Sequence, residues 1–367
     1  MITILLLLIA VSFILSLVGT VIMTHLSRRV GLVDHPGERK IHHTPTPKGG
    51  GVAFFLAIWL PIWLGVAACW FMSRTGWTPP IWPDVTEHIH GVLNVAPRLG
   101  IIFLGALVIS GLGLVDDIRQ LSPWTRLIAQ TIVALGLVCF GISATLFIES
   151  QLLKTIITVL WVVGLVNAFN LLDNMDGLTA GVGAIIAFFF CIVAVQMGHL
   201  FIAAFLCCLI GGLGGFLIYN FPPASIFFGD SGATMLGYLL AVLTLESTFY
   251  QHASQPTQRY FPIIMPLLMF AMPLFDTITV VWIRLRAGRS PFQGDTNHFS
   301  HRLVALGMSR RQAVLAIYLV TATVCMGATI LYYASSAALF VVFVQSLAIF
   351  TIIGILERAR PDKATRP

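Results

Sequence analysis

The chain has 367 residues, of which 57% are hydrophobic and only 10% are charged, and its mean hydropathy is +0.92. Soluble globular domains carry about 25% charged residues, so this composition excludes an ordinary soluble protein and indicates an integral membrane protein. The formal net charge of +6 does not indicate a nucleic-acid partner, because the basic residues are scattered between apolar runs and form no basic stripe.

Runs of about 20 apolar residues, long enough to cross a bilayer as a helix, occur about eleven times. We therefore expect an all-α polytopic protein, with residues 1–367 forming a single integral membrane domain. The expected spans are residues 2–24, 51–71, 98–115, 125–142, 153–171, 178–196, 200–219, 234–248, 261–283, 313–333 and 336–356. The first run lacks a basic leader and a small-residue cleavage site, which predicts a retained helix and not a cleaved signal peptide.

The Lys and Arg residues predict the orientation, because cytoplasmic loops of membrane proteins carry an excess of them. With the N-terminus outside and the C-terminus cytoplasmic, all but four of the 21 lie on the inner side; the exceptions are Arg74, Arg98, Lys154 and Arg259. The expected cytoplasmic segments are about 25–50, 116–124, 172–177, 220–233 and 284–312, followed by a basic tail at 357–367. The polar clusters described next all lie on this side.

Two clusters come from the first half of the chain. Lys48 precedes three glycines at 49–51, which either let backbone and ammonium groups approach a phosphate or merely begin the next helix. Asp116 and Asp117 end the third span. One acid there would be a solvated helix end, but a carboxylate at a helix centre in a bilayer costs about 2.5–3.5 kcal/mol. Two adjacent acids suggest that one attracts a basic partner or a Mg²⁺-bound substrate and the other accepts a proton.

A third cluster follows the fifth span and consists of Asn167, Asn170, Asp173, Asn174 and Asp176. At 100° per residue the three asparagines lie within about 60° of one another on one helix face. Asparagines alone could form a hydrogen-bonding stripe between helices. The added aspartates favour a functional site.

Asp230 is the lone acid of an otherwise uncharged turn at 220–233. It could cap the next helix. It could also bind Mg²⁺, which proteins hold through one or two carboxylates plus substrate phosphate oxygens, and a position facing Asn170 would suit that role.

The last cytoplasmic loop carries Arg289 and the run Asp295-x-x-His298-x-x-His301-Arg302. Arginine suits phosphate recognition, and histidine can donate to a sugar or phosphate oxygen. The excess of cytoplasmic cations explains the arginines by itself, but it does not explain two histidines three residues apart.

In this order the motifs resemble those of the polyprenyl-phosphate N-acetylhexosamine-1-phosphate transferases. This superfamily includes the phospho-MurNAc-pentapeptide translocase and the WecA/TagO-type enzymes that start bacterial surface glycans with GlcNAc-1-phosphate. Residues 167–178 are similar to the family pattern N-x-x-N-x-x-D-G-x-D-G-L, with Asn174 at the first glycine. Residues 298–301 resemble H-x-H-H, with Ser300 at the middle histidine. The Lys-rich stretch of the translocase branch is absent after Asp117, which favours the GlcNAc-type donor over the muramyl one.

The resemblance implies a reaction in which UDP-N-acetylhexosamine and a polyprenyl phosphate, such as undecaprenyl phosphate, give a polyprenyl-diphospho-sugar and UMP. It implies Mg²⁺, or Mn²⁺, held by Asn170 and Asp230, and a lipid phosphate oriented or deprotonated by Asp116 or Asp117. The other residues it implicates are Asp173 and Asp176 around the nucleotide and metal, and, as contacts to phosphate or sugar, Lys48, Asn167, Arg289, His298, His301 and Arg302. Direct attack and a covalent aspartyl intermediate both stay open, as does a homodimer. The expected place is a bacterial-type cytoplasmic membrane, with the active site on the cytoplasmic face.

Two other classes of membrane protein also carry acidic residues in or beside their membrane helices. A CDP-alcohol phosphatidyltransferase also uses acids at inner helix ends, but its D-G-x-x-A-R pattern does not follow Asp176. A secondary transporter would place acids near the bilayer midplane in matched halves of the chain. Here the acids lie at the inner ends of the expected spans, and no internal repeat is evident.

Overall fold

The computed structural model describes residues 2–36, 44–79, 86–144, 149–247, 261–331 and 336–358. The described chain is a helical bundle with one antiparallel pair of two-residue strands. The elements are α1 (Ile2–Val30), β1 (Val33–Asp34), β2 (Thr46–Pro47), α2 (Gly50–Thr75), α3 (Thr86–Arg119), α4 (Pro123–Cys139), α5 (Gln151–Leu172), α6 (Leu178–Gln196), α7 (Leu200–Asn220), α8 (Gly229–Glu246), α9 (Phe261–Met269), α10 (Ala271–Arg286), α11 (Phe299–Ala305), α12 (Arg310–Ile330) and α13 (Ser336–Arg358). The expected tail beyond 358 and Arg259 lie outside the described residues.

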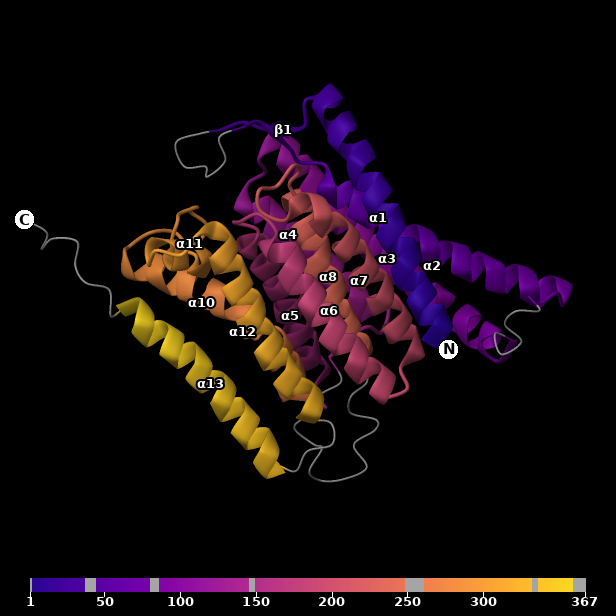
Figure 1. The fold of residues 1–367 in the computed structure, drawn as a ribbon. Helices are drawn as coiled ribbons and strands as arrows, with labels where there is room; N and C mark the ends of the chain where they lie inside the picture. Colours follow the sequence, from indigo (N-terminus) through magenta and orange to yellow (C-terminus); the bar gives the residue numbers. More distant parts are fainter. Residues whose placement is uncertain are drawn as a thin grey trace, which may run out of the picture.

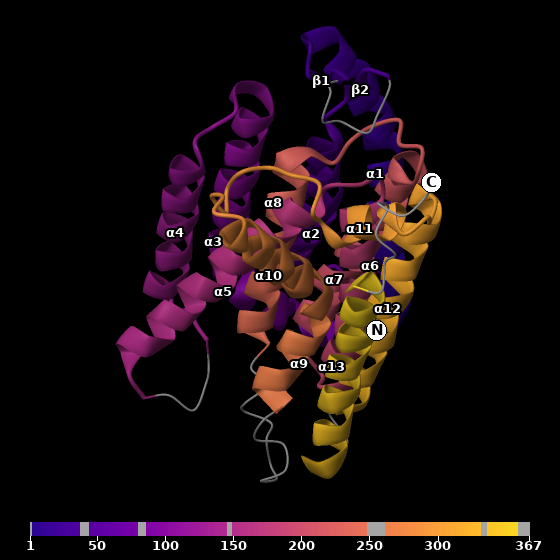
Figure 2. The ribbon, with the colours of Figure 1, turned by 90° about the vertical axis from the view of Figure 1, so that its left-hand side faces the viewer.

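The bundle has a polar end, where the expected cytoplasmic segments meet. α1 runs from the N-terminus at the opposite end toward β1 and β2 (Figure 1). Turned by 90°, the molecule shows α3 and α4 on one flank and α12 and α13 on the other (Figure 2). This arrangement gathers the loops after α3, α5 and α7 and the short helix α11 at one end.

The expected fold class is confirmed, but the count of eleven spans is not. Among the described residues, eight helices are long and apolar enough to cross a membrane, or nine if the bent pair α9–α10 is one span. α4 has only 17 residues, at the lower limit for a span. α8 begins at Gly229, inside the expected loop, and carries an acid near each end. An apolar run predicts a helix, but does not show whether that helix faces lipid.

The expected span 261–283 is broken into α9 and α10, which meet at an angle of 72°. Proline explains the break, because it lacks the N–H that would bond to the carbonyl four residues earlier. Pro273 leaves the carbonyl of Met269 without that partner, and the Cys325 thiol of α12 donates to it at 3.5 Å. The bend brings the loop after α10 toward the polar end of the bundle.

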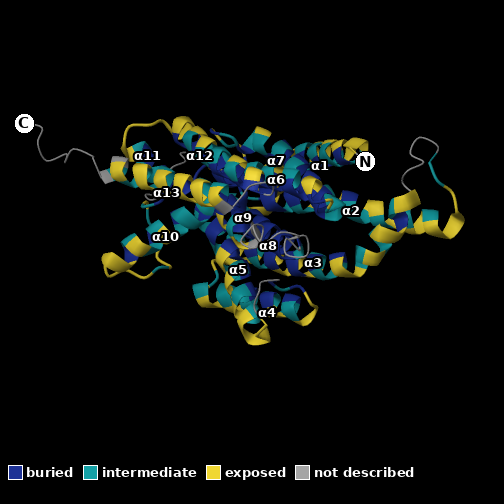
Figure 3. Cartoon of the chain, turned by 90° about the horizontal axis from the view of Figure 1, so that it is seen from below, coloured by how far each residue is buried: buried dark blue, intermediate teal, exposed yellow. Residues whose placement is uncertain are grey.

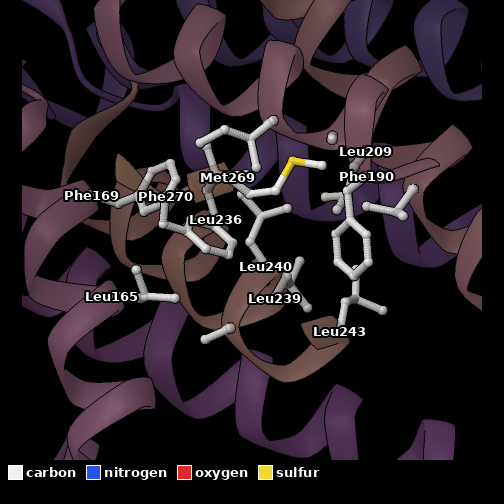
Figure 4. Close-up of a cluster of buried hydrophobic side chains, with 14 of the residues drawn as sticks. Leu165, Phe169, Phe190, Leu209, Leu236, Leu239, Leu240, Leu243, Met269 and Phe270 are labelled. Atoms are coloured by element: carbon white, nitrogen blue, oxygen red, sulfur yellow. The ribbon is translucent and has the colours of Figure 1, made fainter. Parts of the chain in front are cut away.

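α8 forms the centre of the bundle. It packs against α3 and α5 and is buried from Ser231 to Leu245, whereas exposed residues lie on the outer helix faces (Figure 3). Leucines of α8 meet aromatic residues of three other segments, and the labelled members of this cluster in Figure 4 are Leu165, Phe169, Phe190, Leu209, Leu236, Leu239, Leu240, Leu243, Met269 and Phe270. This packing fixes the height at which the polar start of α8 meets the surrounding loops.

Candidate active site

Asp117 joins the end of α3 to the start of α8. Its carboxylate accepts hydrogen bonds from the backbone N–H groups of Asp230 at 3.1 Å and Ser231 at 3.3 Å. A carboxylate is favourable there, because the first N–H groups of a helix lack intrahelical partners and carry partial positive charge. The approach requires Gly113, where a Cβ would lie 2.6 Å from the Asp230 backbone. The adjacent acids Asp116 and Asp117 and the segment Gly229-Asp230 are therefore parts of one junction.

Asp116 holds Arg126 in place. Its Oδ2 accepts from Arg126 Nη1 at 2.7 Å, and its Oδ1 accepts from the Leu121 N–H at 2.5 Å. Arg126 Nη1 also lies 3.8 Å from Asp230 Oδ2. The guanidinium group thus sits between two carboxylates, and Asp116 itself is buried, with 6% of its surface exposed.

The asparagine stripe of α5 divides between two roles. Asn170 Nδ2 donates to Asp230 Oδ1 at 2.8 Å, which is the juxtaposition that suits a metal site. Asn167 donates to Gln130 Oε1 of α4 at 2.6 Å and to the Val163 carbonyl at 2.8 Å. Only the later asparagine reaches the junction, and the earlier one links two helices.

The turn between α5 and α6 is tied to the loop before α8. Asp176 Oδ2 accepts from the Ala224 N–H at 3.0 Å. Asn220 accepts from the Gly177 N–H at 2.9 Å and donates to the Ile226 carbonyl at 2.9 Å. The sequence does not predict this role of Asn220, because an asparagine at a helix end carries no distinguishing pattern.

The carboxyl group of Asp173, in the same turn, predicts how the stability of the folded protein depends on pH. Burial raises its pKa to about 7, and the carboxylates of Asp117 and Asp176 also raise it. A carboxyl group with a higher pKa in the folded state binds its proton more tightly there, so stability falls as pH rises from about 4 to about 7. We expect the melting temperature of the metal-free protein to fall across the upper part of this range, and to fall less in Asp173→Asn. Equal pH slopes in thermal-shift measurements would contradict this assignment.

Lys48 is a second cation beside the acidic junction, in addition to Arg126. Its Nζ lies 3.2 Å from Asp34 Oδ1 and 3.9 Å from Asp117 Oδ1. The short pairing of β1 with β2 places it there, and the Phe227 N–H extends the contact by donating to the Pro47 carbonyl at 2.8 Å. Asp34 of β1 and Lys48, which follows β2, therefore form part of the wall of the site.

The loop after α10 is held by an ion pair between a buried arginine and a partly exposed aspartate. Arg284, 2% exposed, donates from Nε and Nη2 to both carboxylate oxygens of Asp295 at 3.1 and 3.0 Å, and from Nη1 to the Pro291 carbonyl at 2.6 Å. Burial alone would raise the pKa of Asp295, but hydrogen bonds from Arg284 and Asn297 hold it at about 2. The sequence by itself places Arg284 only among the excess of cations expected on the cytoplasmic side.

Removing one partner of this pair is expected to destabilise the fold. Breaking a fully buried ion pair costs about 3–5 kcal/mol, because one charge is left without a partner, and the cost should be smaller here because Asp295 is partly exposed. We expect Arg284→Gln to lower the melting temperature clearly. Arg289→Gln, at an exposed position of the same loop, should change stability by at most about 0.5 kcal/mol. Equal melting temperatures for the two variants would show that the pair does not hold the loop.

The two histidines of the loop have different surroundings. His298 is 5% exposed, and its Nδ1 lies 2.9 Å from a carboxylate oxygen of Asp276. His301 faces a cavity, and burial followed by the neighbouring His298 lowers its pKa. Arg302 does not line the cavity but binds α13, because its Nε donates to Glu357 at 2.8 Å.

A cavity of about 300 Å³ opens between these elements. Its lining residues are Asp34, Lys48, Asp117, Asp173, Asn174, Met175, Asp176, Asn220, Pro222, Phe227, Phe228, Gly229, Asp230, Asp295, Thr296, His301, Arg310 and Val314. Six of them are aspartates, whereas Lys48 and Arg310 are the lysine and arginine of the lining. Without an added cation, such a cavity would repel a diphosphate.

The donor set fits a hard divalent cation that a substrate helps to hold. Among the described residues, no three His, Cys, Asp or Glu side chains converge as a complete metal site, so the protein would supply few of the ligands. Mg²⁺ is commonly bound in this way, through one or two carboxylates and substrate phosphates. The carboxylates of Asp117 and Asp230 both line the cavity, and a cation beside them would relieve their mutual repulsion.

The residues that sequence analysis selected fall into three groups. Those that line the cavity are Lys48, Asp117, Asp173, Asp176, Asp230 and His301. Those that bond to its wall or lie behind it are Asp116, Asn170 and His298. Those that lie elsewhere are Asn167, Arg289 and Arg302. Two further charged lining residues, Asp34 of β1 and Arg310 at the start of α12, belong to none of the sequence motifs.

Comparison with known proteins shows the family to which the sequence is related. The model of a family described as glycosyl transferase family 4 matches residues 99–248, which include the α3–α8 junction. The chain is 33% identical over 350 residues to a probable undecaprenyl-phosphate N-acetylglucosaminyl 1-phosphate transferase of Bacillus subtilis, which covers 92% of this chain and 88% of the relative. It is 33% identical over 327 residues to a decaprenyl-phosphate N-acetylglucosaminephosphotransferase of Mycobacterium leprae, covering 83% of this chain and 77% of that protein. An undecaprenyl-phosphate alpha-N-acetylglucosaminyl 1-phosphate transferase of Yersinia pestis is 26% identical over 330 residues, covering 86% of this chain and 80% of the relative.

Proposed function

Because the chain belongs to glycosyl transferase family 4, we propose that it transfers N-acetylglucosamine 1-phosphate from UDP-N-acetylglucosamine to a membrane polyprenyl phosphate. The products are UMP and a polyprenyl-diphospho-sugar, which starts a lipid-linked surface glycan. The observation that carries the proposal is the cavity at the α3–α8 junction, where the family's acidic motifs meet Lys48. Phosphoryl transfer requires positioning and charge neutralisation more than covalent chemistry, and the lining offers both.

We assign the phosphate of the polyprenyl acceptor to a position beside Asp117 and Lys48. Asp117 lines the cavity, whereas Asp116 is bound to Arg126 behind it. We assign to Asp117 the task of orienting the lipid phosphate or taking its proton, and to Asp116 the task of fixing Arg126. A phosphate monoester with a second pKa near 6 is largely deprotonated at neutral pH, so orientation is the larger part of this task.

We assign the UDP-sugar donor to the remaining part of the cavity. A divalent cation such as Mg²⁺, held by Asp230 and Asn170, would neutralise charge on the diphosphate. Lys48 and Arg310 supply positive charge to the phosphates, and His301 with Thr296 lies where a sugar can be contacted. Direct attack by the lipid phosphate on the β-phosphorus needs no further nucleophile, so we prefer it to an aspartyl intermediate.

The cytoplasmic face is the proposed location of the site. Its support is the distribution of Lys and Arg, because the cavity lies at the end of the bundle where α1 ends with Arg28 and Arg29. The muramyl-pentapeptide donor is a weaker alternative, since the three relatives described above all carry N-acetylglucosamine in their names. None of these three names describes a transporter.

The test is turnover by the purified chain with polyprenyl phosphate, Mg²⁺ and a panel of UDP-sugars, with identification of the released nucleotide. We expect UMP together with a lipid-diphospho-sugar, and the fastest release with UDP-N-acetylglucosamine. Release of UDP would instead show ordinary glycosyl transfer. A preference for the muramyl-pentapeptide donor would move the chain to the translocase branch.

A further inference from the structure

Asp276, which is buried in α10, belongs to none of the sequence motifs described above and does not line the cavity. Asp276 is 1% exposed and is the one acidic residue of α10. A buried charge is costly unless it is paired and hydrogen-bonded, and both oxygens of Asp276 have partners: Oδ2 lies 2.9 Å from His298 Nδ1, and Oδ1 accepts from the Phe299 N–H at 2.6 Å. Asp276 therefore fixes the residue before α11 and the first residue of α11 together.

The contact with Asp276 determines which ring nitrogen of His298 carries a proton. An ionised carboxylate only accepts hydrogen bonds, so Nδ1 of His298 carries the proton that points to Asp276. A histidine ring held in this way has a fixed tautomer and orientation. His298 is nevertheless 5% exposed and does not line the cavity.

The histidine that does line the cavity stands against His298. The rings of His298 and His301 are 6.0 Å apart between centroids and cross at 71°. Between them in the chain, the Ser300 hydroxyl donates to Asn174 Oδ1, and Asn174 is itself part of the cavity wall. Two contacts from different segments thus hold the start of α11, and His301 lies one residue beyond them.

We propose that Asp276 and His298 are positioning residues: the carboxylate holds His298 and the start of α11, and through them places His301 on the cavity wall. The proposal rests on the transfer reaction proposed above and deepens it, because it makes His301 the histidine that contacts the donor and His298 its support. It differs from the expectation drawn from the sequence, in which His298 itself contacts the phosphate or the sugar.

The decisive variant is His298→Asn. The side-chain nitrogen of asparagine occupies nearly the place of Nδ1 and can still donate to Asp276, but the rest of the ring is gone. We expect His298→Asn to keep kcat/KM for the UDP-sugar within about threefold of wild type. His298→Ala and Asp276→Ala should each lose at least about tenfold, with KM for polyprenyl phosphate unchanged. Thr277→Val, which changes the neighbouring side chain on α10, is the matched control and should retain wild-type turnover.

A double-variant cycle tests whether Asp276 acts through His301. We expect Asp276→Asn to reduce kcat/KM in the wild-type background and to have little further effect once His301→Asn has removed the positioned group, since residues that act as a unit are not additive. The melting-temperature changes of the two substitutions should still add. A purely structural role for Asp276 would instead make the kinetic losses add as well.

The outcomes separate this proposal from the function on which it rests. If His298→Asn is as inactive as His298→Ala while its melting temperature is unchanged, the His298 ring itself acts on the substrate and the positional assignment is overturned. Additive kinetic losses in the cycle would overturn the link to His301. A wild-type chain that releases no UMP with any donor would overturn the proposed function itself.

Discussion

Replacing Asp230 with asparagine is expected to reduce UMP release by about a thousandfold, while the protein stays folded in the membrane. The proposed cation contributes several kcal/mol of charge stabilisation, and each 1.36 kcal/mol corresponds to a factor of ten in rate. The variant keeps the size of the side chain and can keep the contact with Asn170, whose amide lies 2.8 Å from Asp230 Oδ1. The measurement is initial rate against Mg²⁺ concentration for both proteins at saturating UDP-sugar.

Glu246 provides a matched control at the other end of the same helix. Its carboxylate bonds to Arg98 Nε at 2.8–2.9 Å, and Glu246→Gln makes the same chemical change far from the cavity. We expect Glu246→Gln to retain turnover and to lose at most about 1 kcal/mol of stability, as partly exposed ion pairs do. Full activity in Asp230→Asn, or equal losses in both variants, would rule out the metal assignment.

Gly229→Ala is expected to abolish most turnover for a different reason. It removes no charged group, but its added methyl group displaces neighbouring atoms of the site. Gly229 has a φ of +74°, and a residue with a side chain pays about 1–2 kcal/mol in that region. A Cβ at this position would also lie 2.6 Å from Asp117 Oδ2, so Asp117 or the start of α8 must move. A displacement of about 1 Å at a reacting centre can cost about a hundredfold in rate, and we expect at least that loss in kcat.

The contrast for this prediction is Gly164→Ala in α5. Nothing lies within 4 Å of a Cβ built there, and alanine favours a helix interior over glycine by about 1 kcal/mol. This substitution should leave turnover unchanged and raise the melting temperature slightly. If Gly229→Ala turned over substrate as fast as Gly164→Ala, the α3–α8 junction would not be rigid enough to carry the proposed mechanism.

The approximate positions of most helices, and the gathering of the acidic motifs, could be predicted from the chain. Apolar runs of about 20 residues predict membrane helices because the bilayer sets their length. Motifs that follow alternate spans must lie on one face of the membrane. Asp117, Asp230 and Asn170 meet for that reason, although they come from three separate segments.

Other features depend on contacts that one segment of sequence does not contain. The apolar run of α8 looks like a lipid-facing span, and only its neighbours show that it is enclosed. Arg284 looks like any cytoplasmic arginine, and its buried pairing with Asp295 depends on the path of the loop. Asp276 is a single acid in an apolar run, and its partner lies 22 residues later.

The enclosed position of α8 also constrains how the protein is made. This helix is not among the eight that are long and apolar enough to enter a bilayer by themselves, and its first turn carries Asp230, whose charge opposes insertion into lipid. Its packing partners α3 and α5 precede it in the chain. During synthesis they emerge first and can offer α8 a protein surface in place of lipid. The order of helices along the chain thus allows the helix that carries the site to enter the membrane after these partners, into a place that they have already begun to form.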